Sequence, residues 1–161
     1  MCPDFTQTRT LPDTWQQWKR LLHPQMWENL APVYFAKDMV SALETLPLAR
    51  LWLTTWQSKV EEWGMNQALG WDVDWIPLQF SLSGRFTKLD PMQDFCETNP
   101  HTPFVWIDDD YAMDLVVRPW AKRMSAPNLI IRPQSTVGIT PQHIAQIQEF
   151  CHSLSPTSIS Q

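Results

Sequence analysis

Short apolar runs alternate along this chain with longer segments in which apolar residues recur at helical spacing. The runs "LWL" and "FVWI" are apolar at every position and "NLII" is apolar after its first residue, which is typical of strands buried on both faces. Strands of this kind, separated by helices, indicate a parallel sheet between two layers of helices. The pattern therefore predicts an α/β fold, a three-layer α/β/α, doubly wound, Rossmann-like parallel sheet.

Turn and capping residues set the bounds of the predicted elements. The expected helices cover residues 35–47, 58–70, 89–98, 110–117, 119–125 and 140–151, and the expected strands cover residues 49–55, 75–80, 102–108 and 128–133. Thr140 is expected to cap the last helix, with Pro141 in its first turn. Ile139 is expected to pack against Ile144. Pro119 is expected to divide the two helical segments around it, because the residue before a proline disfavours helical backbone angles.

The 161 residues divide into three segments by composition. Residues 1–38 are rich in proline and tryptophan and are interpreted as a flap or lid, with packing into the core as the alternative. Residues 39–152 carry the regular pattern of strands and helices and form the expected α/β core. Residues 153–161, "SLSPTSISQ", are expected to be a disordered tail.

The chain has twelve basic and seventeen acidic residues, which give a net charge of -5. This charge argues against a protein whose whole surface binds nucleic acid. A local basic group is interpreted as a solvated helix face, with a phosphate-contact patch as the alternative. Its members are Arg118, Lys122, Arg123 and Arg132. The three cysteines and four histidines show no metal-ligand spacing. No apolar run reaches membrane-spanning length, so we expect no membrane partner and a cytoplasmic location.

Three consecutive aspartates follow the apolar run "FVWI". In parallel sheets, ligands bind beyond the carboxyl ends of the strands, so these acids stand where a site is expected. Asp110 is predicted to cap the helix that follows, because its carboxylate can accept hydrogen bonds from the free N–H groups of that helix. Asp108 and Asp109 repel each other unless a cation offsets their charge, and carboxylate oxygens suit Mg²⁺. We therefore predict that Asp108 and Asp109 bind Mg²⁺.

Hydroxyl and ammonium groups are expected at the same edge of the sheet. Thr54 and Thr55 follow the run "LWL", and Lys88 lies directly before the helix predicted over residues 89–98. Hydroxyls and an ammonium group hold phosphate oxygens, and carboxylates hold the metal ion that accompanies them. Thr54, Thr55 and Lys88 are therefore predicted to bind phosphate. The ordinary alternatives are turn-forming threonines and a solvent-exposed lysine.

Four segments carry a resemblance to a known family, and they are "LARLWLTTW", "TKL", "FVWIDDD" and "NLIIRPQSTVGITPQHIAQIQEF". In order and spacing they resemble the haloacid dehalogenase (HAD) superfamily of phosphohydrolases, over residues from about 40 to 150. The chain is most similar to the small HAD domains grouped with RNA-repair proteins. The resemblance implies that Thr54 holds the transferring phosphoryl group and that Lys88 steadies the charges of phosphate and nucleophile. It also implies that Asp108 and Asp109 bind Mg²⁺.

The family's first motif, an apolar strand that ends in D-x-D, has no full counterpart in this sequence. In the family it supplies an aspartate nucleophile and a general acid/base. Only "MCPDFTQT" lies in the right region, where Asp4, Thr6 and Thr8 spell D-x-T-x-T without the preceding strand. On the resemblance, Asp4 is the candidate nucleophile. We expect the first central strand to lie upstream of the printed sequence, with Met1 as an internal methionine.

The resemblance implies a Mg²⁺-dependent HAD-type phosphohydrolase that acts on a phosphomonoester, either a small molecule or a nucleic-acid end. Without the nucleophile, the alternative is a catalytically impaired HAD-like domain that binds phosphate or another protein. Phospho-receiver domains share acids, threonine and lysine, but their acids come first in the sequence. Here Thr54 and Lys88 precede the aspartates, so we set that class aside.

Overall fold

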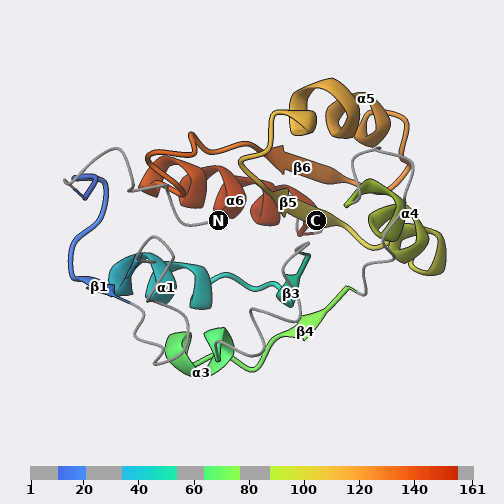
Figure 1. Ribbon diagram of the computed structural model, residues 1–161. Helices are drawn as coiled ribbons and strands as arrows, with labels where there is room; N and C mark the ends of the chain where they lie inside the picture. Colours follow the sequence, from blue (N-terminus) through green and yellow to red (C-terminus); the bar gives the residue numbers. More distant parts are fainter. Residues whose placement is uncertain (1–10, 21–33, 54–63, 77–87, 156–161) are drawn as a thin grey trace, which may run out of the picture.

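The computed structural model describes residues 11–20, 34–53, 64–76 and 88–155, and Figure 1 shows how their helices and strands are arranged. The strands are β1 (Trp18–Arg20), β2 (Tyr34–Ala36), β3 (Leu51–Trp52), β4 (Asp74–Trp75), β5 (Phe104–Ile107) and β6 (Asn128–Ile131). The helical elements are α1 (Lys37–Glu44), α3 (Met65–Leu69), α4 (Leu89–Thr98), the π-helical turn η1 (Met113–Val117), α5 (Arg118–Ala121) and α6 (Pro141–Leu154). Helices and strands therefore alternate along the chain.

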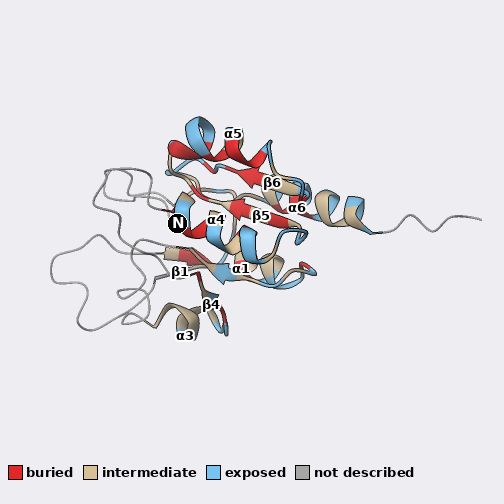
Figure 2. Ribbon diagram, turned by 90° about the vertical axis from the view of Figure 1, so that its right-hand side faces the viewer, coloured by how far each residue is buried: buried red, intermediate tan, exposed pale blue. Residues whose placement is uncertain are grey.

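β5 and β6 form a parallel pair in the most buried part of the described chain. Phe104 lies opposite Asn128, and Ile107 lies opposite Ile131. Figure 2 shows that buried residues concentrate in β5, in β6 and in α5, which lies above them in this view. This pair positions the candidate site, because the three aspartates follow the carboxyl end of β5.

One face of the β5–β6 pair packs against α4, η1 and α5. The buried members of this first apolar cluster are Ile76, Met92, Cys96, Phe104, Trp106, Met113, Val117, Trp120, Ala121 and Ile130. Trp106 and Trp120 meet edge to face with ring centroids 6.3 Å apart, an arrangement that aromatic pairs favour. Side chains alternate across a strand, so the even-numbered residues of β5 take this face.

The opposite face of the β5–β6 pair packs against α1 and α6. The buried members of this second apolar cluster are Leu46, Ile131, Ile144 and Ile147. Val105, Ile107 and Ile139 are partly buried against it, so Ile139 lies in the same cluster as Ile144, as expected from the sequence, while their direct contact stays a prediction. Helices thus cover both faces of the pair, which explains why its strands are almost continuously apolar.

The other two sheets of the described chain also contain two strands each. β3 and β4 are parallel, with Leu51 opposite Asp74, and β1 and β2 are antiparallel, with Lys19 opposite Phe35. This mixture of helices with small parallel and antiparallel sheets confirms the α/β class. The described strands do not form one continuous sheet, so the three-layer, doubly wound architecture stays a prediction.

The last helix begins where the sequence predicted. Thr140 has extended backbone angles, and its N–H donates a hydrogen bond to Nδ1 of His143 at 3.0 Å. A capping box usually makes this reciprocal bond with glutamate or glutamine. Burial lowers the pKa of His143, which favours the neutral ring that can accept the bond. The helix continues to Leu154, beyond the predicted end at Cys151.

The two helical segments predicted around Pro119 are present as η1 and α5, but the chain does not leave the helical conformation between them. Arg118, the residue before Pro119, has helical backbone angles (φ -58°, ψ -46°), and α5 follows η1 without a break. A proline ring inside an α-helix clashes with the carbonyl of the fourth residue before it. The wider π-helical turn over Met113–Val117 relieves this clash, so the chain stays helical through the proline.

Other predicted bounds shift by a few residues or leave the described part of the chain. α4 covers the predicted range 89–98. α3 ends at Leu69, and Gly70 follows in the left-handed conformation (φ 73°) that commonly ends a helix. β4 begins at Asp74, and residues 77–80 of the strand predicted there lie outside the described residues. Within the described ranges, no helix is long and apolar enough to cross a membrane.

Part of the segment 1–38 packs against the core. Trp15 contacts the second apolar cluster, and its indole N–H donates to the carbonyl of Ile139. Phe35 and Ala36 in β2 are buried. Residues 1–10 and 21–33 lie outside the described residues, and the flap or lid over the core stays a prediction.

Candidate functional site

The candidate site starts at the carboxyl end of β5. Asp108 directly follows the strand, and its N–H donates to the carbonyl of Ile131 at 3.1 Å, which extends the pairing with β6 by one residue. The Asp108 residue is only 5% exposed. A carboxylate at this depth requires hydrogen-bonding or charged partners.

Lys88 supplies one of these partners. It stands directly before α4, and its Nζ lies 2.5 Å from Oδ2 of Asp108. Among the described residues, Lys88 and Asp108 are the two polar or charged residues that are buried, each 5% exposed. A positive charge at the start of a helix is disfavoured by the helix dipole, so the position of Lys88 is explained by the carboxylate and not by the helix.

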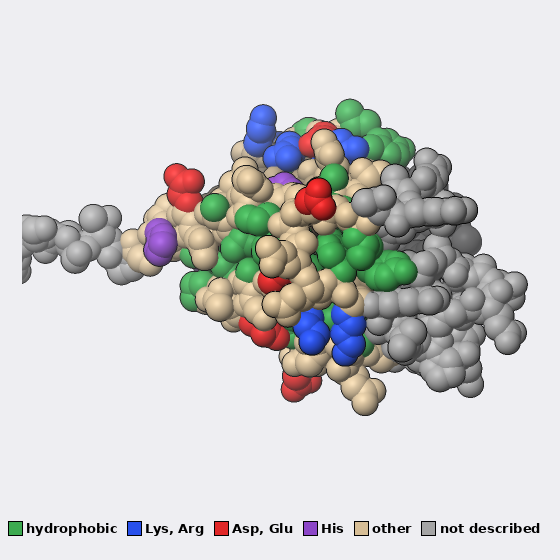
Figure 3. Space-filling model, turned by 90° about the vertical axis from the view of Figure 1, so that its left-hand side faces the viewer, with side chains coloured by type: hydrophobic (Ala, Val, Ile, Leu, Met, Phe, Trp, Pro, Cys, Tyr) green, Lys and Arg blue, Asp and Glu red, His purple; other side chains and the backbone are tan. Residues whose placement is uncertain are grey.

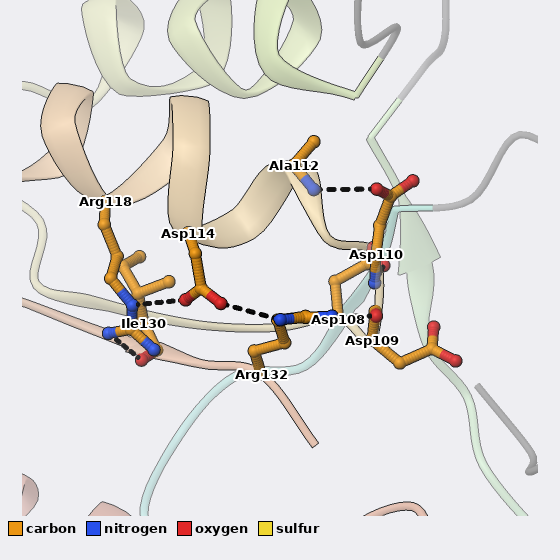
Figure 4. Close-up of polar contacts among 8 residues, drawn as sticks. All are labelled: Asp108, Asp109, Asp110, Ala112, Asp114, Arg118, Ile130 and Arg132. Carbon is orange, nitrogen blue, oxygen red and sulfur yellow. Dashed lines mark hydrogen bonds and ion pairs between the residues drawn. The ribbon is translucent and has the colours of Figure 1, made fainter. Parts of the chain in front are cut away.

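Two aspartates hold the loop after β5. Oδ1 of Asp108 accepts a hydrogen bond from the N–H of Asp110 at 3.1 Å. Oδ1 of Asp110 in turn accepts one from the N–H of Ala112 at 2.9 Å (Figure 4). The second bond satisfies the N–H group of Ala112 directly before η1, which is the kind of contact predicted for Asp110, although the N-cap residue of η1 is Ala112. Both oxygens of Asp108 are therefore engaged within the protein.

Asp109 differs from its two neighbours. Its Oδ1 atom is buried and has no hydrogen-bond partner among the described residues. Its backbone carbonyl accepts a long hydrogen bond of 3.4 Å from Nε of Arg132. Figure 4 shows the Asp109 side chain directed away from Arg132 and Asp114. A buried carboxylate oxygen without a partner costs free energy unless a cation or a donor meets it.

Asp114 joins two arginines next to this loop. Its Oδ1 lies 2.8 Å from Nε of Arg118, and its Oδ2 lies 2.7 Å from Nη1 of Arg132. Arg118 also donates from Nη1 to the carbonyl of Ile130 at 2.9 Å (Figure 4). The hydrogen bond from Arg118, followed by that from Arg132, holds the pKa of Asp114 below its ordinary value. Two of the four residues in the predicted basic group are thus committed to Asp114.

The other two members of the basic group are exposed to solvent. Lys122 and Arg123 are exposed, and Nη1 of Arg123 donates to the carbonyl of Pro119 at 2.9 Å. On the face drawn in Figure 3, the described acidic and basic side chains are interspersed and do not form a broad basic surface. Whether this group is a solvated face or a phosphate-contact patch stays a prediction.

The structure brings together two of the residues that the sequence singled out. Lys88 and Asp108, 20 residues apart in the sequence, form an ion pair, and Asp109 is the next residue. The predicted residues that lie outside the described part of the chain are Thr54, Thr55 and Asp4. Leu53, which directly precedes Thr54, packs against the first apolar cluster, to which β5 also contributes. The chemical roles of all these residues stay predictions.

Sequence reasoning missed Asp114. Its spacing of four residues to Arg118 was a visible signal, because residues at i and i+4 meet on one face of a helix. Its second partner, Arg132, directly follows β6 and is 18 residues away in the sequence, so no local spacing predicts that contact. The pairing depends on how η1 packs beside β6.

Metal-binding and nucleophilic groups are sparse in the described ranges. No group of three or more His, Cys, Asp or Glu side chains that could hold a metal ion occurs among the described residues. The thiol of Cys96 belongs to the first apolar cluster, and burial raises its pKa. A buried thiol of this kind is unreactive, so we assign it to packing.

No protein-family model, curated protein or solved structure matches this chain. The class of the protein therefore rests on the α/β fold and on the groups around Asp108. Those groups are a buried lysine–aspartate pair and a buried carboxylate oxygen without a partner, directly after a parallel strand. In parallel α/β sheets this is the position at which ligands bind.

Proposed function

We propose that this chain is a Mg²⁺-dependent phosphohydrolase of the HAD type that acts on a phosphomonoester, either a small molecule or the end of a nucleic acid. The observation that carries the proposal is the buried pair of Lys88 and Asp108 at the carboxyl end of β5. The adjacent Asp109, with its unpartnered Oδ1, adds a second carboxylate at the same place. Together these residues provide groups that attract a phosphate and a divalent cation.

Stability alone is a poor reason to bury this pair. Removing an ammonium group and a carboxylate from water costs several kcal/mol per ion, which their mutual attraction only roughly offsets. Lys88 also stands at the start of a helix, where positive charge is disfavoured. Residues that break local rules without a gain in stability are expected at functional sites. The pair is therefore best explained by chemistry.

The carboxylates fit Mg²⁺ in their chemistry and supply part of the ligands it needs. Mg²⁺ takes about six oxygen ligands, and the unpartnered Oδ1 of Asp109 is a ligand of that type. Asp108 gives its oxygens to Lys88 and Asp110, so we assign the main contact to Asp109. Water, substrate and residues outside the described ranges would complete the set. The ion would supply a Lewis acid that neutralises charge on the phosphoryl oxygens.

The chain's own residues bind and orient the phosphate in this proposal. The ammonium group of Lys88, held in place by Asp108, binds a phosphate oxygen. In the proposal, the hydroxyl of Thr54, which follows β3 by two residues in the sequence, donates to the phosphoryl group, and the strands belong to a three-layer, doubly wound sheet. The packing of Leu53 against the cluster that includes β5 supports this placement. The remaining candidates are Thr55 for phosphate and Asp4 for the nucleophile.

Hydrolysis of p-nitrophenyl phosphate tests the proposal. Turnover should require Mg²⁺, and Asp109→Asn should lower kcat/KM by about a hundredfold or more, since transition-state charge loses its stabilisation. Asp94→Asn, an exposed position on α4, is the matched control and should keep wild-type activity. Turnover without Mg²⁺, or equal turnover in Asp109→Asn and the wild type, would refute the assignment.

A second candidate is a catalytically impaired HAD-like domain that binds phosphate or another protein. It is favoured by the full engagement of Asp108 and by the lack, among the described residues, of a three-ligand metal group. Calorimetry with inorganic phosphate distinguishes the two candidates. Binding that Lys88→Met weakens, in a protein that does not hydrolyse p-nitrophenyl phosphate, would select the second candidate.

A further inference from the structure

The peptide unit between Asp109 and Asp110 helps to direct the Asp109 side chain. This unit is planar and rigid, and it contains the carbonyl of Asp109 and the N–H of Asp110. The N–H donates to Oδ1 of Asp108 at 3.1 Å, and the carbonyl accepts a hydrogen bond of 3.4 Å from Nε of Arg132. The unit is therefore held at both ends. The Asp109 side chain leaves the backbone at the adjacent Cα, so movement of the unit would also move Oδ1.

Arg132 lies between this peptide unit and η1. It directly follows β6, and its Nη1 lies 2.7 Å from Oδ2 of Asp114 (Figure 4). The guanidinium group is a planar fork, so the bond at Nη1 also restricts the direction of Nε. Asp114 belongs to η1, in which Met113 and Val117 are fully buried. Two side chains, those of Arg132 and Asp114, thus connect the peptide unit to a buried part of the core.

Stability alone is a weak explanation of the contacts that Arg132 makes. The Arg132 and Asp114 side chains are 38% and 44% exposed, and exposed ion pairs contribute little free energy of unfolding. Arg118 already gives Asp114 a charged partner at 2.8 Å, with the four-residue spacing that suits a helix. Arg118 donates its other bond to the carbonyl of Ile130, whereas Arg132 donates to the carbonyl of Asp109. The feature that distinguishes Arg132 from Arg118 is therefore its contact with the loop after β5.

We propose that Arg132 is a positioning residue that orients the carboxylate of Asp109 for metal binding. It acts through the backbone, because the Asp109 side chain is directed away from Arg132 (Figure 4). The atom that it positions is the buried Oδ1 of Asp109, which has no hydrogen-bond partner among the described residues. Groups that hold metal ligands in place matter nearly as much as the ligands, and their loss typically weakens metal binding by about 10–100-fold. The inference rests on the proposed function, which assigns this carboxylate to Mg²⁺.

Relaxation of ¹⁵N nuclei in the metal-free protein tests whether Arg132 holds the loop. The N–H of Asp110 belongs to the peptide unit in question, and its order parameter should be about 0.85 in the wild type, the value of rigid backbone. Arg132→Met removes both donors, and the order parameter should fall toward about 0.6. An Asp110 amide that is as ordered in Arg132→Met as in the wild type would overturn the proposal.

Arg118→Met is the matched control for this measurement. It also removes one positive charge and one ion pair from Asp114, at a side chain that is 42% exposed, but Arg118 donates to Ile130 and not to the loop. The order parameter of Asp110 should therefore stay at its wild-type value. An equal loss of order in Arg118→Met and Arg132→Met would overturn the specific role of Arg132.

Calorimetric titration with Mg²⁺ tests the consequence for metal binding. Arg132→Met should bind Mg²⁺ about tenfold or more weakly than the wild type, and Arg118→Met should stay within about twofold of it. The Tm should fall by about 3 °C or less in both variants, because each loses an exposed ion pair, so a general loss of stability would not explain the difference. Equal Mg²⁺ affinity of Arg132→Met and the wild type would overturn the inference and leave the proposed function standing. No binding of Mg²⁺ by the wild type would instead refute the proposed function, and the inference with it.

Discussion

The buried pair of Lys88 and Asp108 gives a prediction whose magnitude follows from the structure. At the observed separation of 2.5 Å and an effective dielectric constant of about 20, the attraction between the charges is about 7 kcal/mol. Desolvation of the two ions offsets most of this, so the pair contributes little net stability. Removing one partner, however, leaves the other charge alone at a position only 5% exposed. Lys88→Met or Asp108→Asn should therefore each lower the free energy of unfolding by about 3–5 kcal/mol.

The double variant Lys88→Met/Asp108→Asn should lose less free energy of unfolding than the sum of the losses in the two single variants. No unpaired charge is left in it, and the asparagine carbonyl can still accept the hydrogen bond from Asp110. We expect a coupling free energy of about 2–3 kcal/mol between the two positions. Urea unfolding followed by far-ultraviolet circular dichroism measures all four proteins of the cycle.

Exposed residues of the same types provide the controls for this cycle. Lys122→Met and Asp94→Asn should each change the free energy of unfolding by no more than about 0.5 kcal/mol. Additive losses at Lys88 and Asp108, or single losses as small as those of the controls, would refute the buried ion pair.

The helix cap, the core and the surface network give further expectations. Thr140→Ala should lower the free energy of unfolding by about 1 kcal/mol in urea, through loss of the α6 cap. Burial holds the pKa of His143 below its ordinary value of 6.5, so the Tm should fall as the pH drops below about 6.5. His143→Gln keeps a capping acceptor but does not titrate, and it should make the Tm less dependent on pH in this range. Ile147 is 1% exposed, so Ile147→Ala should lower the free energy of unfolding, measured in urea, by about 2–5 kcal/mol. The matched change at the exposed Leu115, Leu115→Ala, should lower it by about 0.5 kcal/mol or less. Since the arginines lower the pKa of Asp114, Asp114→Asn should lower the Tm slightly, and this difference should vanish in 1 M salt or as the pH falls below the ordinary aspartate range. A wild-type profile without acid sensitivity, or a salt-independent effect at Asp114, would contradict these expectations.

Local signals in the sequence predicted the helices better than the strands. α4 and the start of α6 agree with prediction because capping residues and helical periodicity act within a few positions. β3 covers Leu51–Trp52 of the strand predicted over residues 49–55, whose residues 54 and 55 lie outside the described part of the chain, and its bounds depend on pairing with β4. The helical passage through Pro119 depends on a π-helical turn whose Met113 and Val117 are fully buried, and tertiary packing of this kind has no local signal.

The candidate site was predictable in position and not in its contacts. Lys88 and Asp108 flank a predicted helix and a predicted strand, so their place at element ends followed from periodicity alone. Their contact exists because α4 packs on the face of β5 that carries the even-numbered side chains. The unpartnered oxygen of Asp109 and the link from Asp114 to Arg132 depend on the path of the loop after β5. Contacts of this kind depend on the three-dimensional path of the chain and cannot be inferred from residue spacing in the sequence.

Calorimetric titration of Mg²⁺ tests the proposed function most directly. The wild-type protein and the exposed control Asp94→Asn should bind Mg²⁺ with equal affinity. Asp109→Asn should bind it about tenfold or more weakly, because the buried Oδ1 loses its charge. Equal affinity of Asp109→Asn and the wild type, or no binding of Mg²⁺ by the wild type, would contradict the proposal that this site holds the metal ion of a phosphohydrolase.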